Sequence, residues 1–114
     1  KLDVDKMKQA ASYLVGENDF KSFCAVGAQV KTTTRTIYSC EVKKDENDII
    51  TIRVTGNGFL YNMVRIIAGT LIRVGGGEMA PDEIPQILGK KDRTAAGPTA
   101  PAHGLTMMGI EYGE

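Results

Sequence analysis

The sequence lacks an excess of charge of either sign, because 14 Lys and Arg residues balance 14 Asp and Glu residues. Overall charge therefore does not indicate nucleic acid, a membrane surface or an acidic substrate as a partner, and any anion site must be local. Long apolar runs are also missing, since no stretch reaches the roughly 18 to 20 residues needed to cross a bilayer. The first residues are charged and polar, unlike a signal peptide. We therefore expect a cytoplasmic protein without a membrane partner.

Cysteine and histidine are scarce. Cys24 and Cys40 lack the spacing of metal ligands, and His103 is the single histidine, so a zinc site would have too few soft ligands. We expect no metal, and two free thiols rather than a disulfide. No nucleophile or carboxylate motif accompanies His103, which favours a place on a loop surface over a catalytic role.

The length of 114 residues is sufficient for one domain with a modest core. The chain starts at Lys1 rather than at Met. Such a start is typical of a processed chain or an excised domain, and an expression boundary explains it equally well.

The first part of the chain is predicted to form an amphipathic helix followed by an ordered loop. Apolar residues recur at helical spacing from Leu2 to Leu14, Asp3 or Asp5 can cap the start, and Gly16 ends the helix. The following "GENDFKSFCAVGAQVK" mixes turn formers with aromatic residues, which favours a packed loop over a regular element.

Two strands are predicted next, joined by a turn at "DEND". The first, from Thr33 to Lys43, is rich in β-branched residues, and the second runs from Ile49 to Thr55. Alternation along the first strand predicts one shared face for Thr36, Tyr38, Cys40 and Val42. In the second strand it places Ile50, Ile52 and Val54 together. The pair is predicted to be an antiparallel hairpin.

The remaining sequence predicts two helices and a last strand. The stretch "GNGFLYNMVRIIAGTLIRVGGG" predicts a long helix to about Val74, and "APDEIPQILGKKD" a short one with Pro81 in its first turn and Gly89 past its end. A loop rich in Pro and Gly then leads to a strand from Leu105 to Tyr112. This order predicts an α+β fold, a small mostly antiparallel sheet with one long and one or two shorter helices packed on one face.

Arg65 stands near the middle of the long, otherwise apolar helix. At about 100° per residue the core stripe of that helix comprises Leu60, Met63, Val64, Ile67, Leu71 and Val74. Arg65 lies on another face, near Tyr61, Gly69 and Ile72. Either its guanidinium reaches water from a half-exposed face, or a further layer, from this chain or an absent domain, covers it and supplies a carboxylate or phosphate. Burial of the guanidinium without a partner is nearly excluded, because an unpaired buried charge costs several kcal/mol.

Four blocks of the sequence together resemble a known family. "DFKSF", "RTIYSCEV", "GNGFLYNMVRIIAGTLIRVG" and "KDRTAAGPTAPAHGL" are similar, in this order, to the carboxy-terminal half of the bacterial tRNA pseudouridine synthase A family. The resemblance implies that the whole protein isomerises uridine to pseudouridine at tRNA positions 38, 39 and 40, in the anticodon stem-loop, without a cofactor or metal. It also implies that residues 1–114 are one domain, half of a pseudouridine synthase fold. The catalytic aspartate, and a tyrosine near the target base, belong to sequence preceding Lys1, so this chain alone is expected to be inactive.

The resemblance assigns roles to residues of this chain as well. Arg65 maps onto the basic residue that pairs with the catalytic aspartate, and Leu105 and Tyr61 are candidates for binding the substrate base. For Leu105 a place in the core is the alternative. Family members are homodimers that grip tRNA along a basic cleft. The candidates for phosphate contacts are Arg35, Arg53, Arg73, Lys90, Lys91 and Arg93, each of which is, taken alone, as well explained as a solvated surface charge.

A different class of function stays open at this point. The chain could be a stand-alone α+β module that binds RNA or a metabolite without catalysing a reaction. The open reading frame separates the two hypotheses, because an upstream half with a catalytic aspartate supports the enzyme and a start codon just before Lys1 supports the module.

Overall fold

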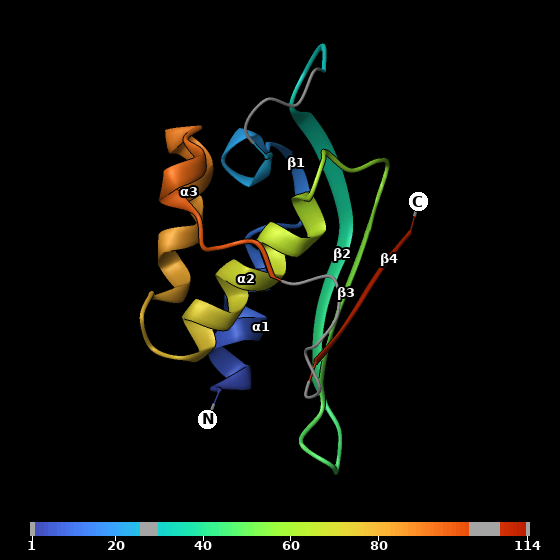
Figure 1. Cartoon of the computed structure of the whole chain (residues 1–114), viewed down its shortest axis with the longest axis vertical. Coiled ribbons are helices and arrows are strands. Elements are labelled where there is room, and N and C mark those ends of the chain that lie inside the picture. Colours follow the sequence, from blue (N-terminus) through green and yellow to red (C-terminus); the bar gives the residue numbers. More distant parts are fainter. Residues whose placement is uncertain (1, 26–29, 101–107, 114) are drawn as a thin grey trace.

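Three α-helices lie on one face of a four-stranded sheet in a computed structural model that describes residues 2–25, 30–100 and 108–113, the last six by their backbone (Figure 1). The helices are α1 (Val4–Ser12), α2 (Met63–Gly75) and α3 (Ile84–Lys90), and the strands are β1 (Gly16–Asp19), β2 (Thr34–Lys44), β3 (Ile50–Gly56) and β4 (Met108–Gly113). Short 3-10 turns are η1 (Lys21–Phe23), η2 (Pro81–Glu83) and η3 (Arg93–Ala95). The predicted α+β class is confirmed. Among the described residues, no helix is long and apolar enough to cross a membrane.

The strands follow one another across the sheet in chain order. β1 pairs antiparallel with β2, β2 pairs antiparallel with β3 as the hairpin prediction requires, and β4 pairs in parallel with β3. β1 corrects the prediction of a loop after Gly16. Its sequence "GEND" has little intrinsic preference for a strand, and it becomes one because β2 supplies the hydrogen-bonding partner.

One face of β2 was predicted only in part. Cys40 and Val42 lie opposite Val54 and Ile52 of β3 and pack towards the core, as expected. The register then shifts between Ile37 and Ser39, so the buried residue at the start of β2 is Ile37. Such a β-bulge inserts one extra residue and reverses the alternation, which leaves Tyr38 58% exposed and corrects the predicted face at Thr36 and Tyr38.

The core lies between the sheet and the helices α1 and α2, which contact each other (Figure 1). The N-cap of α1 is Asp3, whose side chain accepts a hydrogen bond from the Lys6 amide at 3.1 Å. All six residues of the predicted stripe are buried, Leu60 just before α2 and, on α2 itself, Met63, Val64, Ile67, Leu71 and Val74. Ile50, Ile52 and Val54 of β3 are buried as predicted.

The second predicted helix begins as expected and ends later. Pro81 stands at the start of η2, which continues into α3. Gly89 lies inside α3 rather than past its end, and Lys91, in the left-handed conformation with φ 52°, is the C-cap. The left-handed conformation that often ends a helix occurs at Lys91 and not at Gly89. The glycine in the sequence therefore led to a predicted helix end that is too early.

Candidate active site

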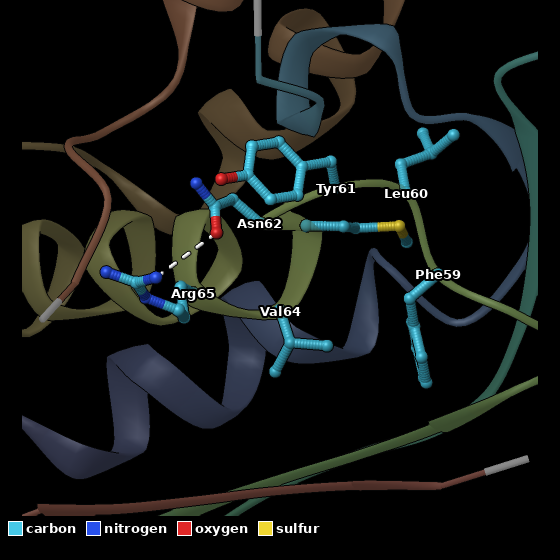
Figure 2. A pocket seen from close by; sticks show the side chains of 7 residues that line it. Phe59, Leu60, Tyr61, Asn62, Val64 and Arg65 are labelled. Atoms are coloured by element: carbon cyan, nitrogen blue, oxygen red, sulfur yellow. Dashed lines mark hydrogen bonds between the residues drawn. The ribbon is translucent and has the colours of Figure 1, made fainter. Parts of the chain in front are cut away.

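A pocket of about 450 Å³ opens where the chain enters α2. It is lined by seven consecutive residues, Phe59 to Arg65 (Figure 2). The polypeptide reaches this point directly from β3, and the amide of Ala25 donates a hydrogen bond to the carbonyl oxygen of Tyr61 at 3.2 Å. The pocket is therefore held between the end of a core strand and the start of a buried helix.

The guanidinium of Arg65 borders this pocket and is half-buried. Its Nε donates to the carbonyl oxygen of Ala100 at 2.8 Å. Its Nη1 donates to Oδ1 of Asn62 at 3.2 Å, the hydrogen bond drawn in Figure 2. Both acceptors are uncharged. No acidic residue within the described ranges pairs with Arg65. Since a guanidinium has five N–H donors, the remaining donors on Nη1 and Nη2 can still receive an anion as a two-pronged fork.

Asn62 takes up a backbone conformation that is uncommon for a residue with a side chain. It is the N-cap of α2 and is left-handed, with φ 59° and ψ 9°. Asparagine tolerates this region better than most residues. Its amide oxygen accepts from Arg65 and makes no capping hydrogen bond to the amides of α2, so the side chain of this N-cap is used by the guanidinium.

The second face of α2 is covered by residues 96–100, which we call the strap. In Figure 1 the strap is the orange segment that follows α3 and crosses α2. The amide of Ala100 donates to the Arg65 carbonyl oxygen at 2.9 Å, and the amide of Gly97 donates to Oγ1 of Thr70 at 2.9 Å. A Cβ atom on Gly69 would overlap the carbonyl oxygen of Pro98. The covering layer therefore comes from this chain, and it offers Arg65 a carbonyl group rather than the carboxylate or phosphate considered from the sequence.

Of the two candidates for contacting the substrate base, the structure describes Tyr61 and does not describe Leu105. Tyr61 lines the pocket with 68% of its surface exposed, which leaves its ring accessible to a ligand. Leu105 lies outside the described residues, as does His103. The structure thus brings Tyr61 and Arg65 together, and the role of Leu105 stays a prediction.

The six basic candidates are spread over several elements. Arg53 on β3, Arg73 on α2 and the pair Lys90 and Lys91 at the end of α3 are exposed. Arg35 is half-buried and donates from Nη1 to the carbonyl oxygens of Thr32 and Thr34. Arg53 lies opposite Glu41 in the sheet register.

The remaining candidate, Arg93, is engaged by the strap. Its Nη1 donates to the Gly97 carbonyl oxygen at 2.8 Å, and its Nη2 donates to Oγ1 of Thr99 at 3.2 Å. Of the six cations, Arg93 is therefore the one whose fork is directed at the segment that covers α2.

The two cysteines are free, as predicted. Burial raises the pKa of the Cys24 thiol, and burial together with the neighbouring Glu41 raises the pKa of Cys40 to about 12. Both thiols therefore stay protonated near neutral pH, which argues against a nucleophilic role.

Comparison with known proteins identifies the family. A family model described as tRNA pseudouridine synthase matches residues 10–113, which is most of the chain. The chain belongs to this family. It is 54% identical over 112 residues to the tRNA pseudouridine synthase A of Bacillus pumilus and 56% identical over 111 residues to that of Ruminiclostridium cellulolyticum. These alignments cover 98% and 97% of this chain and 45% of each relative.

A relative from Bacillus subtilis with the same name is 49% identical over 112 residues. The chain therefore spans less than half the length of these curated relatives, in agreement with the predicted resemblance to one half of a synthase. Membership in the tRNA pseudouridine synthase family confirms that resemblance. The roles of Arg65, Tyr61, Leu105 and the basic residues stay predictions.

Sequence reasoning missed three groups of this site: Asn62, Thr70 and the Ala100 carbonyl. An asparagine directly before a helical run was an available signal for the first. The other two depend on the path of the strap, which no local pattern encodes. Two glycines, Gly69 and Gly97, sit where α2 and the strap approach each other, and their small size was the one hint of a close crossing.

Proposed function

We propose that the whole protein to which this chain belongs isomerises uridine to pseudouridine in the anticodon stem-loop of tRNA. The chain supplies the supporting arginine and part of the pocket and RNA surface, and a preceding half supplies the catalytic aspartate. Family membership and the name shared by the relatives, tRNA pseudouridine synthase A, support this proposal.

The observation that carries the proposal is the arrangement of Arg65. Its guanidinium borders a pocket of about 450 Å³ and is fixed by two uncharged acceptors, Ala100 and Asn62. A half-buried cation without a carboxylate from the described residues of its own chain is suited to receive one from elsewhere. The catalytic aspartate of the missing half is the proposed occupant.

The chemistry of the reaction explains why such a cation is useful. The bond from N1 of uracil to C1′ of ribose breaks, the base turns, C5 bonds to C1′, and the proton lost from C5 is balanced by one gained at N1. All atoms are retained, so the step balances without an oxidant or a reductant. In a desolvated pocket an adjacent guanidinium favours the ionised carboxylate and fixes its oxygens. Tyr61, exposed at the same pocket, offers an aromatic surface to the extruded base.

Contact with the tRNA backbone is the second part of the proposal. Arg53, Arg73, Lys90 and Lys91 are exposed, and with Arg35 they are the proposed phosphate contacts of a homodimeric enzyme. Each such contact makes binding depend on salt, because a phosphate releases counterions when a cation neutralises it. Alanine substitutions are expected to weaken tRNA binding and leave the chemical step unchanged.

Substitution of Arg65 in the full-length protein tests the role of the guanidinium. We expect Arg65→Ala to lower kcat by at least about 100-fold, because the catalytic carboxylate loses its charged partner. The pKa of that carboxylate should rise, so the acidic limb of the pH–rate profile moves to higher pH. Pseudouridine formation in transcribed tRNA is the measurement. Arg73→Ala, at the exposed end of the same helix, is the matched control and should alter affinity without shifting the profile.

Two results would contradict this account at different levels. Normal turnover and an unshifted profile in Arg65→Ala would remove Arg65 from the mechanism while leaving the enzyme's identity intact. A full-length wild-type protein that forms no pseudouridine would overturn the function itself. The chain alone is expected to form no pseudouridine. Activity restored by adding the separately expressed preceding half would support the proposal that one half supplies the aspartate and this chain supplies the arginine.

A further inference from the structure

We propose that Arg93 and Thr70 are positioning residues that hold the guanidinium of Arg65 through the strap. The inference rests on the proposed role of Arg65 and assigns Arg93 a function other than contact with a tRNA phosphate. Three consecutive links carry it, from Arg93 to the strap, from the strap to Thr70, and from the strap to Arg65.

The first link is the fork of Arg93 on the strap. Nη1 donates to the Gly97 carbonyl oxygen at 2.8 Å and Nη2 donates to Oγ1 of Thr99 at 3.2 Å. Arg93 is half-buried, and it lies in η3, directly before the strap. Two coplanar nitrogens of one guanidinium therefore fix two residues of the strap, an arrangement that the single nitrogen of an ammonium group lacks.

The second link is the hydroxyl of Thr70, which is fully buried in α2. It donates to the Ile66 carbonyl oxygen at 2.8 Å and accepts from the amide of Gly97 at 2.9 Å. Gly97 is thus held on both sides, by Arg93 at its carbonyl and by Thr70 at its amide. The fit is close, because a Cβ on Gly97 would lie 2.8 Å from Cα of Thr70.

The third link joins the end of the strap to Arg65. Ala100 and Arg65 exchange two hydrogen bonds, from the Ala100 amide to the Arg65 carbonyl at 2.9 Å and from Arg65 Nε to the Ala100 carbonyl at 2.8 Å. The second bond fixes the plane of the guanidinium and occupies Nε. A carboxylate is then received by the donors of Nη1 and Nη2, so a displaced strap would turn the fork away from it.

The test compares substitutions in the full-length protein with transcribed tRNA as the substrate. Arg93→Lys keeps the charge and removes the fork, while Thr70→Val keeps the shape and removes the acceptor for the Gly97 amide. Each is expected to lower kcat on the order of 10-fold with KM for tRNA changed less than about 2-fold. Thr70→Ser restores the hydroxyl and should rescue kcat. Thr94→Val is the matched control, because Thr94 is exposed and, among the described residues, its side chain bonds to nearby Asp92 alone.

A structural readout accompanies the kinetics. Amide hydrogen exchange in peptides covering the strap should become faster in Thr70→Val and stay unchanged in Thr94→Val. This measurement depends on the strap alone, so it reports on the links even if the kinetic assay gives no signal.

The outcomes separate the inference from the proposed function. If Arg93→Lys keeps normal kcat while Arg93→Ala raises KM and reduces the salt dependence of binding, Arg93 is a phosphate contact and the inference is wrong. Unchanged exchange and kcat in Thr70→Val would overturn it as well. An inactive wild-type protein would instead overturn the proposed function on which the inference rests.

Discussion

The two faces of α2 are held to the rest of the molecule by different kinds of contact. The face toward the sheet is a stripe of apolar side chains, and Ile67 and Leu71 at its centre are fully buried. The opposite face meets the strap through hydrogen bonds at Arg65 and Thr70 and through a glycine without a side chain, Gly69. The free energy gained by burying apolar side chains depends little on their orientation, whereas a hydrogen bond requires a particular distance and angle between donor and acceptor. The first face therefore supplies stability, and the second supplies the orientation that the proposed site requires.

Truncating the same residue type on the two faces gives the largest expected difference. Ile67→Ala should lower the free energy of unfolding by about 2–5 kcal/mol, because it leaves a cavity in the core. Ile72→Ala, at a half-buried position on the other face, should cost about 1 kcal/mol or less. Chemical denaturation measures both. Equal losses would show that the strap face contributes to stability as much as the core face does.

Adding one methyl group tests the close approach of the strap. Gly69→Ala should destabilise the fold by about 1–3 kcal/mol, since the new Cβ would overlap the Pro98 carbonyl. Gly89→Ala is the matched control, because Gly89 lies in α3 with open space around its Cβ position. There alanine should stabilise by about 0.5–1 kcal/mol through its higher helix propensity. Thermal midpoints that move in opposite directions would confirm the contrast, and a stable Gly69→Ala variant would argue against it.

The smallest expected effect concerns a half-buried polar cluster at Asp19 of β1, in contrast to the buried hydrogen bond between the strap and Thr70. The Thr33 hydroxyl donates to Asp19 at 2.6 Å, and this hydrogen bond, with the Lys21 amide and the nearby charge of Lys91, lowers the pKa of Asp19 below 3.8 despite some burial. A lowered folded-state pKa contributes stability that is present above about pH 4 and is lost as the pH falls through the lowered value.

Asp19→Asn should therefore cost less than about 1 kcal/mol near neutral pH. Its difference from wild type should shrink toward zero in acid, as followed by denaturant unfolding between about pH 7 and pH 2. A difference that stays constant over this range would show that the carboxylate charge does not contribute.

Elements were predictable from the sequence where the deciding interactions are local, and were missed where those interactions come from residues far away in the chain. The alternation of Ile50, Ile52 and Val54 and the stripe on α2 were predicted because burial repeats with the period of the element itself. The bulge at Tyr38 was missed, since a change of register is decided by the partner strand. The strand β1 was missed for the same reason.

The same distinction between local and long-range interactions applies to the candidate site. The sequence by itself determined that Arg65 stands apart from the core stripe and that the chain belongs with the tRNA pseudouridine synthases, because helical period and motif order are written along the chain. Only the tertiary structure decided what meets Arg65. The acceptor of its Nε is the backbone carbonyl of Ala100, 35 residues away, and a carbonyl is common to every residue type. No side-chain pattern can mark such a partner, so its identity came from the path by which the strap crosses α2.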